Sequence, residues 1–246
     1  MKLELGNTPK HLKENTSGND SDTDLVIGKK VIAREPYIDF ESYMKTKAEF
    51  SIKDNTSNPG PLAIFGFGLT TCLLSLHNAG VFPLNVVVFA MAFCYGGLAQ
   101  IIGGLFEWYK GKMFTSVVFI SYGLFWWSFA LLFILPAAGV AEKPDPIGMG
   151  FYLFLWGVFS FAFLICSVNK PKIFFLIFLT VVLVFWLLAI ENWSEDKRCG
   201  KAAGVIGVIC SILAMYAATG ELVNGNFGRT IIPMGAPTIK ETKFKA

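Results

Sequence analysis

Six polar side chains lie in or beside long apolar stretches of this sequence, where they could hold a small polar solute. They carry amides, hydroxyls and one phenol, and they are Asn58, Thr70, Thr71, Asn78, Tyr95 and Gln100. A buried primary amide must find hydrogen-bond partners, either in a neighbouring helix or in a solute. Threonine hydroxyls can instead bond to the backbone of their own helix. We therefore take these six residues as candidate contacts for a solute that forms hydrogen bonds.

Ionisable side chains are placed differently along the chain. Glu107, Glu191, Glu221 and His77 fall near the ends of the apolar stretches, and no Asp, Glu, Lys, Arg or His lies at the centre of one. Carboxylates of a membrane proton relay are expected inside such stretches. The sequence thus offers no candidate for a dedicated relay.

Patterns of known catalytic and metal-binding sites are absent from the sequence. It contains no HExxH, GxSxG, Walker loop, GxGxxG or CxxC pattern, and no basic patch for nucleic acid. Four of the five cysteines lie inside apolar stretches, which favours a packing role. We therefore predict no enzyme, no catalytic residues, no metal site, no cofactor and no nucleic-acid partner.

The elements that must position the polar residues are long apolar helices. The 246 residues are 54% hydrophobic and 16% charged, with a mean hydropathy of +0.54, whereas a soluble domain carries about 25% charged residues. A spanning helix needs about 20 mostly apolar residues. Six stretches meet this requirement, at roughly 60–79, 84–108, 114–139, 147–169, 172–192 and 201–223. The sequence predicts an all-α, polytopic membrane protein whose six transmembrane helices form one domain over residues 58–225.

The first of these stretches begins with Asn-Pro-Gly-Pro at residues 58 to 61. Asparagine is a favoured helix cap, and proline is tolerated in the first turn, so these residues predict a helix start. Gly66 and Gly68 allow two interpretations. They either permit close packing of a second helix or leave room for a solute.

Charge distribution predicts the orientation of the helices. The terminal tails and the loops near residues 110 and 170 carry most of the Lys and Arg, and the opposite side has only Lys143, Lys197, Arg198 and Lys201. By the positive-inside rule both termini should be cytoplasmic. Residues 1–57 form a cytoplasmic tail that we expect to be mostly disordered. An amphipathic helix over 37–50 is considered within it, and 226–246 form the C-terminal tail.

Several stretches together resemble one family, the acetate uptake transporters or succinate–acetate permeases. They are NPGPLAIFGFG at 58–68, LSLHNAG at 74–80, YGGLAQ at 95–100, SYGLFW at 121–126, YLFLWG at 152–157, LLAIEN at 187–192 and FGRTIIPMG at 227–235. They occur in the family's order over the whole membrane region, and the long polar N-terminal tail is similar to that of the fungal branch.

The resemblance implies a plasma-membrane protein of six helices per protomer that assembles as a hexamer and conducts acetate and related small monocarboxylates. It also implies a hydrophobic constriction in each protomer, which maps to Phe67, Tyr122 and Val181. Family behaviour implies proton-linked transport, whereas the lack of central carboxylates favours a channel-like path or a proton carried on the substrate. An acetate-selective anion channel, an ammonia or water channel, and a non-transporting sensor with a signalling tail remain alternatives.

Overall fold

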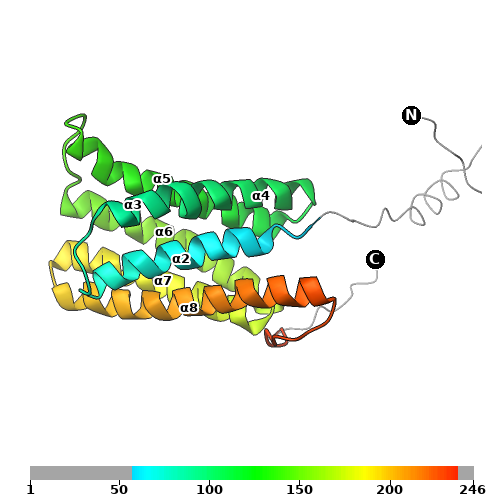
Figure 1. The fold of residues 1–246 in the computed structure, drawn as a ribbon. Coiled ribbons are helices and arrows are strands. Elements are labelled where there is room, and N and C mark those ends of the chain that lie inside the picture. Colours follow the sequence, from blue (N-terminus) through cyan, green and yellow to red (C-terminus); the bar gives the residue numbers. More distant parts are fainter. Residues whose placement is uncertain (1–56, 238–246) are drawn as a thin grey trace, which may run out of the picture. The chain divides into compact units, whose positions relative to one another are not determined.

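The computed structural model describes residues 57–237 as a bundle of long helices (Figure 1). The proposed amphipathic helix at 37–50, nearly all of the predicted N-terminal tail and residues 238–246 of the predicted C-terminal tail lie outside the described residues. The described helices are α2 (Gly60–Asn78), α3 (Val86–Met91), the π-helix η2 (Ala92–Ala99), α4 (Gln100–Tyr109), α5 (Met113–Ala137), α6 (Pro146–Cys166), the short 3₁₀ helix η3 (Ser167–Asn169), α7 (Lys172–Ser194) and α8 (Lys197–Phe227). Because α3, η2 and α4 form one span, and α6 and η3 another, these residues contain six helices long and apolar enough to cross a membrane. The predicted fold class is confirmed.

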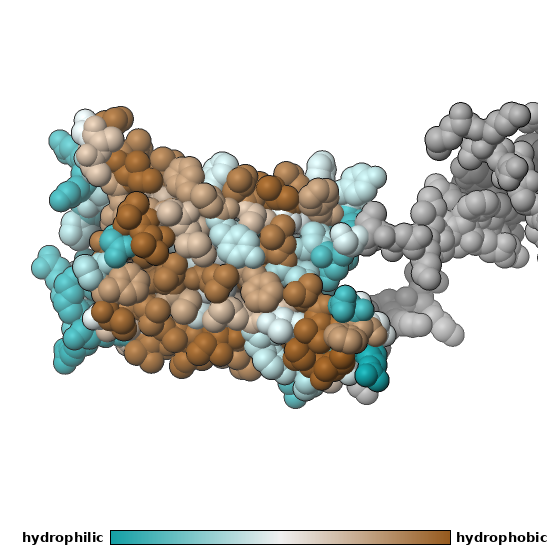
Figure 2. All heavy atoms as spheres, viewed as in Figure 1, coloured by the Kyte–Doolittle hydropathy of each residue, from teal (hydrophilic) through white to brown (hydrophobic). Residues whose placement is uncertain are grey.

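Connections between the spans alternate between two ends of the bundle. The start of α2, the α4–α5 and α6–α7 connections and the end of α8 lie at one end, which we name the inner end after the predicted orientation (Figure 1). The α2–α3, α5–α6 and α7–α8 connections lie at the other, the outer end. Hydrophobic residues cover most of the flank between the two ends, and hydrophilic residues gather at the ends (Figure 2). This distribution suits a bundle surrounded by lipid.

Close packing explains the glycines of α2, which lies against α8 and η2. A Cβ atom added at Gly66 would lie 2.5 Å from the carbonyl oxygen of Tyr95, and one added at Gly68 would lie 3.3 Å from the Cβ of Ala214. Small residues allow helix backbones to approach this closely. The packing interpretation of Gly66 and Gly68 therefore holds, and they do not leave space for a solute.

The predicted start of α2 matches the described contacts. The side-chain oxygen of Asn58 accepts a hydrogen bond of 3.0 Å from the backbone N–H of Gly60, so this asparagine caps the helix although Pro59 occupies the formal cap position. The side chain supplies a partner for a backbone donor that the first helical turn leaves free.

The last helix is longer than the sequence predicted at both ends. It begins at Lys197 because the Asp196 carboxylate accepts a 2.9 Å hydrogen bond from the backbone N–H of Arg198. The Arg198 side chain also donates hydrogen bonds to this carboxylate and thereby lowers the pKa of Asp196. The helix ends at Phe227, where Gly228 adopts a positive φ of 63°. Hydropathy alone missed these outer turns because they carry charged and small polar residues.

The second span contains a π-helical segment that the sequence analysis did not anticipate. Within this segment, over Ala92–Ala99, the carbonyl oxygen of Phe93 accepts a 2.9 Å hydrogen bond from the indole N–H of Trp127. The glycine at position 97 lies directly against the same indole ring, where a Cβ atom would overlap it. Irregular turns of this kind are often found at functional sites, and here the turn joins the second and third spans.

Candidate permeation path

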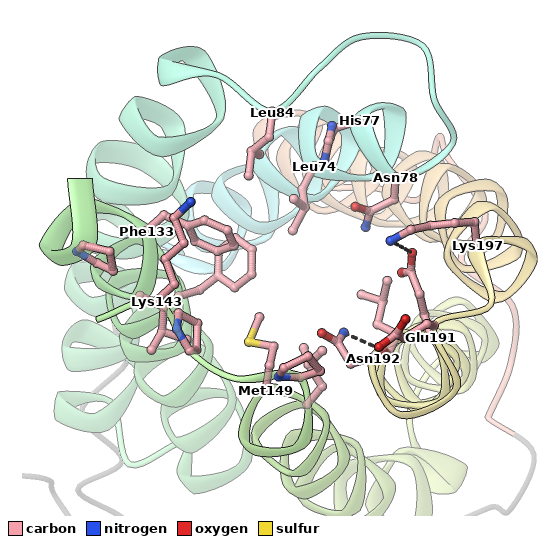
Figure 3. Close-up of a pocket in the computed structure, with 18 of the residues that line it drawn as sticks. Leu74, His77, Asn78, Leu84, Phe133, Lys143, Met149, Glu191, Asn192 and Lys197 are labelled. Carbon is pink, nitrogen blue, oxygen red and sulfur yellow. Dashed lines mark hydrogen bonds and ion pairs between the residues drawn. The ribbon is translucent and has the colours of Figure 1, made fainter. Parts of the chain in front are cut away.

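A cavity of about 920 Å³ opens among the helices at the outer end, and we name it the outer vestibule (Figure 3). Its polar side chains include those of His77, Asn78, Lys143, Glu191 and Lys197. The Lys197 ammonium pairs with the Glu191 carboxylate at 3.5 Å, and the His77 Nδ1 atom lies 3.0 Å from the carbonyl oxygen of Phe82. The vestibule thus presents charged and amide groups above an apolar floor that includes Leu74 and Phe129.

Two smaller cavities follow the vestibule into the bundle. The first, the middle cavity, has a volume of about 50 Å³ and shares Leu74, Asn78, Phe129, Leu153 and Leu188 with the lining of the vestibule. The second, the inner cavity, has a volume of about 40 Å³ and is lined by residues that include Ile64, Gln100 and Phe174. Since a water molecule needs about 10–15 Å³ of such space, each small cavity has room for only a few water-sized groups.

Three residues line both the middle and the inner cavity and so separate them. They are Phe67 of α2, Tyr122 of α5 and Val181 of α7. The rings of Phe67 and Tyr122 are 5.8 Å apart between centroids, and Tyr122 and Val181 are 3% and 5% exposed. The phenol of Tyr122 donates a 2.8 Å hydrogen bond to the hydroxyl of Ser160. Three helices that are distant in sequence therefore bring together the residues that the resemblance assigned to a constriction.

The six candidate contact residues separate into two groups in the structure. Thr71 and Asn78 line the middle cavity, and Gln100 lines the inner cavity. The hydroxyl of Thr71 and the amide oxygen of Gln100 are buried and have no hydrogen-bond partner. Buried polar atoms normally have a partner, so these two atoms are exceptions among the described residues.

The other three candidates are absent from the linings of these cavities. The fully buried hydroxyl of Thr70 donates a 3.4 Å hydrogen bond to the carbonyl oxygen of Met91 and so links α2 to the second span. Tyr95 belongs to the π-helical segment. The Asn58 amide donates a 3.1 Å hydrogen bond to the Glu221 carboxylate, which joins the start of α2 to α8 at the inner end.

Sequence reasoning missed the burial of two polar side chains, Trp126 and Glu107. Trp126 lines the middle cavity, is 2% exposed, and its indole N–H has no partner. Glu107 lies near the end of α4, yet it is 1% exposed. Its carboxylate pairs with Lys112 at 3.3 Å and accepts a hydrogen bond from Thr115. Lysine five residues after a glutamate across a turn is a signal for the ion pair of Glu107. For Trp126 the signal is its place at the end of the family stretch SYGLFW at 121–126.

Six spans with apolar flanks define a polytopic α-helical membrane protein. Comparison with known proteins shows that the chain belongs to the GPR1/FUN34/yaaH family, whose pattern matches residues 40–235. This confirms the membership expected from the sequence motifs.

Three relatives of this chain carry names that describe transport. The chain is 41% identical over 179 residues to the succinate-acetate/proton symporter SatP of Escherichia coli (strain K12), covering 73% of this chain and 95% of that protein. It is 33% identical over 196 residues to acetate permease A of Emericella nidulans, covering 72% and 65%. It is 37% identical over 171 residues to ammonia transport outward protein 2 of Saccharomyces cerevisiae, covering 66% and 60%.

A solved structure described as that of the bacterial acetate channel SatP has the same fold. It is 40% identical to this chain and superposes with a TM-score of 0.73, covering 74% of this chain and 100% of the bacterial one.

Proposed function

We propose that this chain transports acetate and related small monocarboxylates across the plasma membrane through a path inside each protomer. The observation that carries the proposal is the meeting of Phe67, Tyr122 and Val181 between two small cavities, beneath a wide polar vestibule. The names of the bacterial symporter, the bacterial channel and the fungal permease all support acetate as the substrate.

In this proposal the three residues form a hydrophobic constriction that admits a small solute only after most of its water is removed. Thr71 and Asn78 offer hydrogen bonds on the outer side of the constriction, and Gln100 offers them on the inner side. Thr70, Tyr95 and Asn58 act indirectly, because they hold α2 against the second span and α8. A narrow apolar passage flanked by hydrogen-bonding groups favours a small amphipathic solute over a hydrated ion.

The proton in this mechanism travels on the substrate. The ionisable side chains that line the two small cavities are limited to Tyr122 and Cys210 among the described residues. An acetate anion in an apolar passage has a large desolvation cost, and a carboxylic acid with a pKa of about 4 loses that cost when it is protonated. Acid outside should therefore increase uptake, which agrees with the name of the bacterial symporter.

The remaining parts of the proposal concern the assembly. We expect a hexamer with both termini in the cytoplasm. Large apolar side chains remain exposed along the flanks of the single protomer, among them Leu155, Val205 and Ile212. Such surfaces suit contact with lipid and with neighbouring protomers. Crosslinking of the purified protein in detergent, followed by mass measurement, tests the number of protomers.

The test of transport is the uptake of labelled acetate into proteoliposomes that contain the full chain. A pH gradient, acid outside, is imposed first, and then a voltage is imposed at equal pH. Accumulation driven by the pH gradient supports proton-linked transport, whereas flux that follows only voltage and the acetate gradient indicates an anion channel. Uptake no higher than in empty liposomes contradicts the proposal and favours a sensor.

One relative's name refers to ammonia, so the same vesicles must distinguish the two solutes. Vesicles preloaded with unlabelled acetate should accelerate the entry of labelled acetate if acetate occupies the path. A matched preload of ammonium chloride should have no such effect. If internal acetate does not accelerate the entry of labelled acetate, the result contradicts acetate as the solute of this path.

A further inference from the structure

Two hydrogen-bond donors without partners belong to residues that line the middle cavity. They are the indole N–H of Trp126 and the hydroxyl of Thr71, and both atoms are buried. The other wall residues are mostly apolar, including Leu74, Phe125 and Val184. A buried donor without a partner is costly, so such groups are normally satisfied by protein, water or a ligand. A ligand in this cavity that accepts hydrogen bonds would supply partners for both donors.

Size and polarity of the cavity narrow the class of ligand. Its volume of about 50 Å³ corresponds to about three to five water-sized groups when each needs about 10–15 Å³. Acetate has four non-hydrogen atoms, of which two oxygens accept hydrogen bonds and one methyl group is apolar. The cavity therefore matches a short carboxylate whose oxygens meet the two donors and whose methyl group meets the apolar wall.

Trp126 is held firmly in this position. Its ring lies 5.3 Å from that of Phe125 and 6.3 Å from that of Phe129, both in edge-to-face arrangements. With 2% of its surface exposed, the indole has little freedom to turn away. A fixed donor loses less conformational entropy on binding than a mobile one.

We propose that Trp126 and Thr71 form a carboxylate-binding subsite on the outer side of the constriction, in which each donates a hydrogen bond to the substrate. The inference rests on the proposed function, because it assumes that carboxylates pass through the middle cavity. Indole N–H is a donor only, whereas the threonine hydroxyl both donates and accepts. Trp126 therefore rejects ammonium, which offers only donors, and selects ligands with acceptor atoms.

Trp186 provides a matched control within the same chain. Its indole nitrogen is also buried without a partner, but the residue is absent from the linings of the vestibule and of the two small cavities. Its ring lies near those of Phe154 and Phe161 on α6. Replacing Trp186 by phenylalanine changes the same chemical group in a place where the proposal expects no ligand.

The experiment measures the half-saturating acetate concentration for uptake into proteoliposomes containing wild type, Trp126→Phe, Trp186→Phe or Thr71→Val. Loss of one hydrogen bond to a carboxyl oxygen of the substrate should raise this concentration by up to about tenfold in Trp126→Phe. Thr71→Val, which removes the hydroxyl and keeps the side-chain shape, should raise it several-fold. Trp186→Phe should match wild type, and ammonium should not compete with acetate in wild type.

The outcomes separate the inference from the proposed function. Wild type without acetate uptake contradicts the proposed function itself. Wild-type uptake with unchanged half-saturation in Trp126→Phe and Thr71→Val overturns the subsite alone, as does an equal increase in Trp186→Phe. Melting curves of each purified variant identify a misfolded protein, and if Trp126→Phe misfolds, Thr71→Val decides the question. Calorimetric titration of the purified proteins with acetate should reproduce the same order of affinities.

Discussion

Replacing Phe67 by alanine tests the constriction most directly. The phenylalanine ring lines cavities of about 50 and 40 Å³, and its removal widens the passage between them. An acid longer than acetate by one or two methylene groups then gains room that the wild-type passage denies it. A pocket contact that discriminates by one methylene group changes rates by about 10- to 200-fold. We therefore expect the ratio of acetate uptake to butyrate uptake to fall at least tenfold in Phe67→Ala.

The assay is uptake of labelled acetate and labelled butyrate by proteoliposomes at one pH, so that both acids are protonated to a similar extent. Phe65→Ala is the matched control, because Phe65 lies two residues earlier on α2 and packs against the core without lining the cavities. Burial of Phe67 is partial, so the loss of stability should remain below the roughly 3–5 kcal/mol of a fully buried phenylalanine. An acetate-to-butyrate ratio in Phe67→Ala equal to those of wild type and Phe65→Ala would refute the reasoning.

Other perturbations address packing and electrostatics. Gly66→Ala should destabilise the fold by about 1–3 kcal/mol, because the new Cβ would lie 2.5 Å from a carbonyl oxygen of the second span. Gly225→Ala is the control, because a Cβ atom there would have no other atom within 4 Å. Melting temperatures of the two variants test the difference. Lys112→Met should destabilise the protein by up to about 3 kcal/mol in thermal or denaturant unfolding, because Glu107 then loses the cation of its buried pair. An unchanged melting temperature would show that the hydrogen bond from Thr115 is sufficient to stabilise the buried Glu107 carboxylate. Asp196→Asn should lower stability at neutral pH only, because the pKa of the Asp196 carboxylate is lower in the folded state. Its contribution to stability is therefore present above the unfolded pKa of about 3.9 and disappears as the pH falls through the folded pKa. A difference in stability from wild type that persists at acid pH would contradict this prediction.

Much of the fold could be predicted from the sequence because a transmembrane helix satisfies its backbone hydrogen bonds within itself. Hydropathy alone therefore located six spans, and Asn58 with its prolines marked the start of α2. The π-helical segment could not be predicted, since Ala92–Ala99 is equally apolar in either kind of turn. Its register depends on Trp127 and on the close approach of α2.

The candidate site shows the same division. Family motifs pointed to Phe67, Tyr122 and Val181, and the sequence identified the polar residues of the first two spans. Only the tertiary structure decided which of these residues reach a cavity. Thr70 and Thr71 are adjacent, yet consecutive residues point about 100° apart around a helix. The hydroxyl of Thr70 therefore bonds to the carbonyl oxygen of Met91, whereas Thr71 lines the middle cavity.

Burial of single side chains was also decided by neighbouring helices. Trp126 lines a cavity whose other walls come from α2, α6, α7 and α8, while Glu107 is buried although it stands near a helix end. Sequence by itself determined which segments enter the membrane, because that depends on the apolar content of each helix alone. Which polar groups face a solute depends on how six helices pack together, and that information exists only in the folded bundle.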